Sequence, residues 1–97
     1  MSEVKIVRLA TGEELICEIN KTETEGVWRF KDVAILIPTQ ANSLGLAPFM
    51  AYSDAPYGME INEKFIMFIV EPVADLKSQW QKMFSKVITA NNQKIIV

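Results

Sequence analysis

The sequence predicts a small all-β domain: a strongly bent, five-stranded barrel followed by one C-terminal helix. Three observations predict it: a strand, glycine turn and strand pattern from Val4 to Ile19, a change of strand phase within residues 27–37, and a switch to helical spacing after Pro72. The 97 residues fit one domain with one core, with the barrel at about 4–71, the helix at about 73–85 and a tail at 86–97.

The first predicted hairpin turns at residues 10–13, Ala-Thr-Gly-Glu, which interrupt two apolar, β-branched runs. Leu15, Cys17 and Ile19 then share one face, because side chains of a strand alternate with a period of two. We therefore expect Cys17 to be a small core residue. A reactive thiol needs basic neighbours, and the adjacent Glu18 is acidic.

The second predicted feature is a long strand over residues 27–37 after a polar loop at 20–26. Trp28 and Phe30 mark one face, but the following apolar residues fall on the alternate set, namely Val33, Ile35 and Ile37. A bend or bulge near Lys31 and Asp32 would keep both sets buried. Such a bend suits a small barrel.

Two further strands are expected after a loop at residues 39–43. Residues 44–52 contain Gly45 and Pro48, which indicates an edge strand or a bulge. After a turn at 53–58, residues 59–70 are predicted to form the last long strand, whose Phe65–Val70 part is apolar on both faces. In so small a domain, the second cover of that strand could be another subunit.

A helical period begins after Pro72, with apolar residues three and four positions apart: Val73, Leu76, Trp80, Met83, Phe84 and Val87. We expect an amphipathic helix of about three turns that docks on the core. For the tail at 86–97, a final hairpin about Asn91 and Asn92 is the prediction.

The composition excludes several classes of function. The chain has 49% hydrophobic and 23% charged residues, and its net charge of -2 gives no general attraction to phosphate. Cys17 is the only cysteine and there is no histidine, so intramolecular disulfides, cysteine–histidine zinc sites and histidine catalysis are all excluded. Because Glu13 and Glu14 are adjacent, they would point to opposite sides. We expect no enzyme activity, cofactor, metal or small-molecule substrate.

Location follows from similar negative signals. Residues 1–4 lead directly into a strand pattern without the basic and apolar blocks of a signal peptide. The longest apolar run, residues 65–70, is far shorter than the roughly 20 residues that span a bilayer. The prediction is a cytoplasmic protein with no membrane contact.

Two aromatic residues could bind a nucleobase. Trp28 and Tyr57 could each stack a base or close a pocket, because aromatic faces favour nucleobases without needing charge. The competing interpretation places Trp28 in the core and Tyr57 on the surface of a Pro-Tyr-Gly turn.

The residues of two segments resemble the motifs of Sm-like (LSm) proteins, whose barrel is SH3-like. The first motif lies over residues 9–32, at Leu9, Gly12, Leu15, Ile19, Trp28, Phe30 and Asp32, and the second lies over residues 61–69. The Gly-Leu-Ala-Pro segment at residues 45–48 resembles the small, divergent Sm-like proteins of marine phages. The resemblance covers roughly a third of the chain.

The resemblance implies an RNA site near positions Glu23, Glu25, Val27, Asn62, Glu63 and Lys64. The chain departs from the family pattern there, because family members that bind RNA carry an Asp-x-x-x-Asn loop and a basic residue before a glycine. Valine offers no hydrogen-bond partner to a base edge, and glutamate is a poor stacking surface beside a phosphate.

The resemblance also implies homo-oligomeric rings, in which the fourth strand of one subunit pairs with the fifth strand of the next. The interface residues would be Leu46, Phe49, Phe65, Met67 and Phe68. Two hypotheses remain open: an oligomeric ring that binds RNA or a ribonucleoprotein, and an assembly or scaffold protein that keeps the ring and has lost the RNA site.

Overall fold

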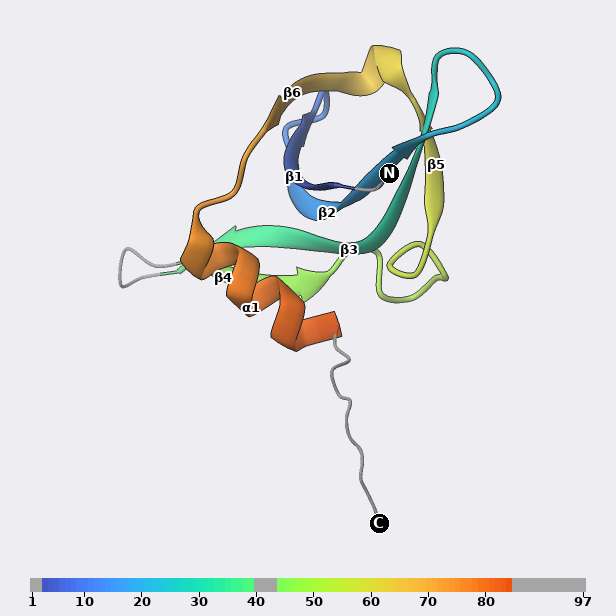
Figure 1. Cartoon of the computed structure of the whole chain (residues 1–97). Helices are drawn as coiled ribbons and strands as arrows, with labels where there is room; N and C mark the ends of the chain where they lie inside the picture. Colours follow the sequence, from blue (N-terminus) through green and yellow to red (C-terminus); the bar gives the residue numbers. More distant parts are fainter. Residues whose placement is uncertain (1–2, 40–43, 85–97) are drawn as a thin grey trace.

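The computed structural model describes residues 3–39 and 44–84, which form an antiparallel sheet and one helix (Figure 1). The predicted hairpin about Asn91 lies outside the described residues. The strands are β1 (Glu3–Leu9), β2 (Glu14–Lys21), β3 (Val27–Pro38), β4 (Leu44–Pro48), β5 (Met59–Asn62) and β6 (Ile66–Val70), and the helix is α1 (Ala74–Phe84). A β-rich fold with a C-terminal helix is thus confirmed.

The strands follow the order β4-β3-β2-β1-β6, and β5 pairs with the first part of β3. β5 and β6 do not pair with each other, so the hydrogen-bonded sheet is not closed; the 3₁₀ turn Glu63–Phe65 connects them. Figure 1 shows the strands curving around a common interior, with α1 outside the sheet.

The predicted bend in the long strand is confirmed as a β-bulge. Ile16 pairs with Ala34 and Glu18 pairs with Lys31, so Cys17 lies opposite two residues, Asp32 and Val33. Asp32 has a φ of 55°, which is in the left-handed region. The extra residue shifts the alternation of side chains by one position. As a result, Phe30 and Val33 are both fully buried in one interior cluster.

This interior cluster contains the buried side chains Val7, Leu9, Leu15, Cys17, Ile19, Phe30, Val33 and Phe49. It confirms the predicted inward face of β2 and the role of Cys17 as a core residue. Trp28 and Ile35 pack against it, but Ile37, predicted with them, is 43% exposed near the end of β3.

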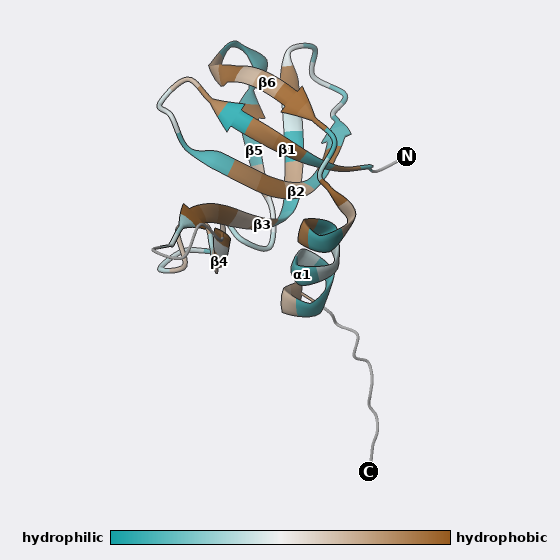
Figure 2. Cartoon of the chain, turned by 90° about the vertical axis from the view of Figure 1, so that its left-hand side faces the viewer, coloured by the Kyte–Doolittle hydropathy of each residue, from teal (hydrophilic) through white to brown (hydrophobic). Residues whose placement is uncertain are grey.

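The opposite face of the sheet is covered by α1, as the helical spacing predicts. Leu76 and Trp80 form a second buried cluster with Ile16 and Ala34 of the sheet. Figure 2 shows this helix beside β2 and β3, with hydrophilic residues on its outward side. The Trp80 indole Nε1 donates a hydrogen bond of 2.7 Å to the carbonyl of Asp32, which ties the helix to the bulge.

The prediction of one long last strand over residues 59–70 is wrong. Residues 63–65 form a 3₁₀ turn instead, so the sheet has six strands. The Asn62 side chain accepts a hydrogen bond from the Lys64 amide at 3.0 Å, and this cap starts the turn. The predicted strand at 44–52 likewise ends at Pro48, although it is an edge strand as expected.

We predict that Trp80→Phe lowers the free energy of unfolding by about 1–3 kcal/mol, because the Asp32 carbonyl loses its donor. Urea unfolding followed by circular dichroism measures the change. Val73→Ala is the control; Val73 is 70% exposed beside the same helix, so its substitution should change the stability by less than about 0.5 kcal/mol. Equal effects of the two changes would contradict the role of this bond.

Candidate functional site

The two segments predicted to hold RNA lie side by side in the structure. Val27, the first residue of β3, pairs with Asn62, the last residue of β5. Next to this pair, the Glu63 amide donates a hydrogen bond of 2.8 Å to the carbonyl of Gly26. The loop at residues 22–26 and the 3₁₀ turn therefore form one surface, although 36 positions separate Gly26 from Asn62.

The loop at 22–26 is held by short-range hydrogen bonds. The Thr22 hydroxyl donates to the Val27 carbonyl at 2.9 Å and accepts from the Thr24 amide at 3.1 Å. Gly26 has a φ of 82°, a conformation that glycine adopts without strain. This path directs the Gly26 carbonyl toward the 3₁₀ turn and leaves Glu23 and Glu25 exposed.

The polar groups of this surface are poorly suited to a base edge. The Asn62 side-chain oxygen already accepts from the Lys64 amide, and Val27 has no polar side-chain atom. The Glu63 carboxylate lies close to Gly26, because a Cβ built on Gly26 would be 3.9 Å from Oε2. The three carboxylates of Glu23, Glu25 and Glu63 outnumber the two lysines at this end of the molecule, Lys21 and Lys64, so the end is acidic.

Two lysines at the same end approach aromatic rings. Lys21 Nζ lies 5.9 Å from the centre of the Trp28 ring, and Lys64 Nζ lies 5.8 Å from the centre of the Phe65 ring. Surfaces that bind single-stranded nucleic acid combine aromatic rings for base stacking with positive charge for the backbone, and both kinds of group occur at this end of the molecule. The contact between Lys21 and Trp28 could not be predicted from the sequence, because it depends on β2 lying against β3.

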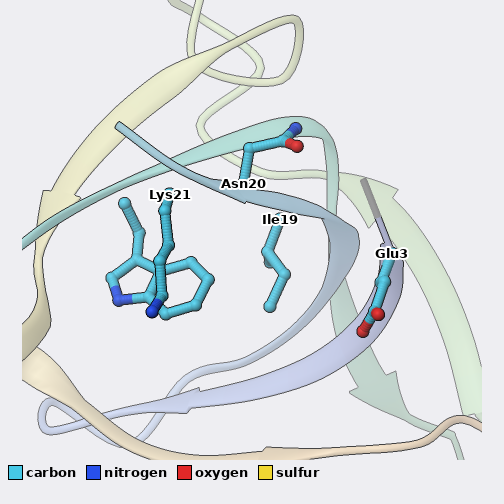
Figure 3. Close-up of a pocket in the computed structure, with 5 residues that line it drawn as sticks. Glu3, Ile19, Asn20 and Lys21 are labelled. Atoms are coloured by element: carbon cyan, nitrogen blue, oxygen red, sulfur yellow. The ribbon is translucent and has the colours of Figure 1, made fainter. Parts of the chain in front are cut away.

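Trp28 lines two cavities. One, of about 350 Å³, is also lined by Glu3, Ile19, Asn20 and Lys21 (Figure 3). The other, of about 590 Å³, runs along β6 and the 3₁₀ turn and is lined further by Glu63, Lys64, Ile66, Met67 and Ile69. Trp28 is therefore both a core residue and part of the surface, which combines the two interpretations from the sequence.

The predicted interface residues separate into two groups. Phe65, Met67 and Phe68 are about half exposed on and next to β6, so they are available to a partner. Leu46 packs in the cluster beneath α1, and Phe49 lies in the interior cluster. The turn that follows Pro48 directs Phe49 inward, where its amide donates to the Val33 carbonyl at 3.0 Å. Phe49 therefore belongs to the core and offers little surface.

Other candidate chemistry is limited. Burial raises the pKa of the Cys17 thiol to about 12, and the charge of Glu18 adds to the shift, so this thiol is a poor nucleophile. No cluster of three metal-ligating side chains occurs within residues 3–39 and 44–84. Over the same residues, the helix is too short and polar to cross a bilayer.

Neither protein-family models nor curated proteins gave a match to this chain.

We predict that Gly26→Ala lowers the free energy of unfolding by about 1–2 kcal/mol, because a Cβ is disfavoured at its positive φ. Thermal or urea unfolding measures the loss. The matched control is Gly45→Ala in β4, where the φ is not positive and an added Cβ meets only ordinary contacts at 3.6 and 3.7 Å. A loss at Gly45 as large as the loss at Gly26 would argue against backbone strain in the loop.

Proposed function

We propose that this chain is an Sm-like assembly module, which joins further copies of itself through the free edges of its sheet. Three features support an Sm-like barrel: a meander of β1, β2 and β3, a bulged third strand, and a 3₁₀ turn before a last strand that returns to β1. The contact between the two segments that resemble Sm motifs supports it as well.

The exposed apolar surface of β6 is the observation that carries this proposal. Phe65, Met67, Phe68, Ile69 and Val70 are between 38% and 57% exposed, whereas Ile66 between them packs against the interior cluster. β6 pairs only with β1, so its other side has no strand partner among the described residues. A long apolar edge of this kind favours pairing with another strand.

β4 supplies a second free edge, and its available backbone groups can be identified. Phe49 donates to Val33, so residues 45 and 47 direct their backbone groups toward β3 by the alternation of an antiparallel ladder. Leu44 and Leu46 then direct their N–H and C=O groups away from β3. Pro48 has no N–H to offer, so it ends this row of donors.

The same reasoning identifies the outward groups of β6. The Leu9 amide donates to Glu13 on the β2 side, whereas the Ala10 amide donates to Phe65 on the β6 side. Alternation therefore places Phe68 and Val70 in bonded pairs with β1, and Ile69 directs its N–H and C=O groups away from it. Each edge thus offers backbone donors and acceptors to a neighbour.

Because β4 and β6 are different surfaces, pairing between them is heterologous. A heterologous contact repeats from copy to copy and forms a ring where the rotation closes. We therefore expect a closed oligomer larger than a dimer, with β6 of one copy beside β4 of the next.

The first test uses two charge substitutions, one on each edge. We predict that Met67→Lys on β6 and Leu44→Lys on β4 each convert the oligomer to a monomer at micromolar concentration, because a lysine at a strand edge opposes pairing. An equimolar mixture should form a 1:1 dimer and nothing larger, since each variant keeps one intact edge. Light scattering coupled to size-exclusion chromatography measures both results.

The matched control is Gln79→Lys, which adds the same charge on an exposed position of α1. It should leave the oligomer unchanged. A wild-type protein that is monomeric at these concentrations, or a mixture of the two variants that stays monomeric, would exclude assembly through these edges.

Binding of single-stranded RNA at the acidic end is the second candidate function. The observation in its favour is that two aromatic rings, Trp28 and Phe65, and two lysines, Lys21 and Lys64, lie near both segments that resemble Sm motifs, because bases stack on aromatic faces and lysines attract phosphate. Glu23, Glu25 and Glu63 oppose it, because they repel phosphate. The scaffold function therefore has the stronger support.

Fluorescence anisotropy with oligo-U and oligo-A RNA at low salt tests this second function. If RNA binds, Lys21→Ala combined with Lys64→Ala should weaken binding by about tenfold or more, because each substitution removes a positive charge that attracts phosphate. Lys82→Ala on α1 is the control and should leave the affinity unchanged. An absence of binding at low salt would exclude the RNA function and leave the assembly function intact.

A further inference from the structure

The segment between β4 and β5 is longer than the fold requires. β4 ends opposite Ala34 and β5 begins opposite Phe30, so only positions 31–33 of β3 separate their pairing partners. Ten residues, 49–58, connect the two strands on the other side. We call this segment the tyrosine loop, because it carries Tyr52 and Tyr57.

The tyrosine loop is fixed at its base. Phe49 and Pro56 are both buried, and the Pro56 carbonyl accepts a hydrogen bond of 2.8 Å from the Val33 amide beside the bulge. Within the loop, the Ser53 hydroxyl donates to the Met50 carbonyl at 2.8 Å and accepts from the Ala55 amide at 3.0 Å. The backbone of the loop is therefore ordered before any partner arrives.

The side chains at the tip of this loop are not used by the fold. Tyr52 is 88% exposed and Tyr57 is 71% exposed. Among residues 3–39 and 44–84, no cation lies over either ring and no cation forms an ion pair with the Asp54 carboxylate. The arginine nearest to the loop is Arg29 of β3, which lies at its base, where a Cβ built on Gly58 would be 2.8 Å from Nη2. The loop itself contains no lysine or arginine. Two aromatic rings and one carboxylate thus stand on a rigid base.

We propose that the tyrosine loop binds a partner protein through arginine side chains. A guanidinium group can stack on a tyrosine ring and also form hydrogen bonds to a carboxylate, which an ammonium group does less well. Rigid tyrosines give contact area at low entropic cost, and this is why they are enriched where proteins recognise each other. This inference is independent of assembly through β4 and β6.

The test uses hexa-arginine as a probe and hexa-lysine as its chemical control, with the full chain labelled for amide NMR spectra. Hexa-arginine should shift the amides of residues 50–58 and bind at least threefold more tightly than hexa-lysine. The double variant Tyr52→Leu and Tyr57→Leu should lose about fivefold or more in affinity, whereas Tyr52→Phe with Tyr57→Phe should retain most of it.

The acidic surface at Glu23, Glu25 and Glu63 provides the internal comparison, because any cationic peptide is attracted there. Shifts concentrated at residues 22–26 and 63 would overturn the proposal. Equal affinity for the two peptides, or for the tyrosine and leucine forms, would overturn it as well. Because both tyrosines are exposed, their substitution should leave the fold intact. Well-dispersed amide spectra of each variant verify this.

Discussion

The left-handed backbone of Asp32 is the constraint on which most of this structure depends. It inserts one extra residue into β3, so that Phe30 and Val33 both point into the interior and Ala34 points toward the helix. The bulge also serves both neighbours of the strand: the Asp32 carbonyl accepts from Trp80, and the Val33 amide donates to the tyrosine loop. A non-glycine residue at positive φ is disfavoured, and these contacts offset its cost.

The bend, the inner face of β2 and the helix could be predicted from the sequence because each depends on local periodicity. The two sets of apolar residues in β3 have a period of two but differ in phase, and only a bulge lets both sets face one core. Leu76 and Trp80 are four residues apart, and both are buried on the face of α1 that contacts the sheet.

The start of the last strand could not be predicted, because local periodicity does not determine it. Phe65–Val70 is apolar without interruption, so its periodicity does not indicate where a strand begins. The 3₁₀ turn depends instead on a cap from Asn62 and on a backbone hydrogen bond from Glu63 to Gly26 across the molecule. The two segments that resemble Sm motifs also lie side by side because of a long-range contact, the pairing of β5 with the beginning of β3.

The distribution of charged and apolar side chains on the surface favours self-assembly over nucleic-acid binding. Carboxylates gather where the loop at 22–26 meets the 3₁₀ turn, and the two nearby lysines already lie over aromatic rings of the same chain. Apolar side chains gather on β6, where backbone groups of Ile69 also point outward. A β-sheet edge gains hydrogen bonds and buried apolar area together when a second strand pairs with it. The acidic end would have to overcome the repulsion of phosphate before it gained a stacked base.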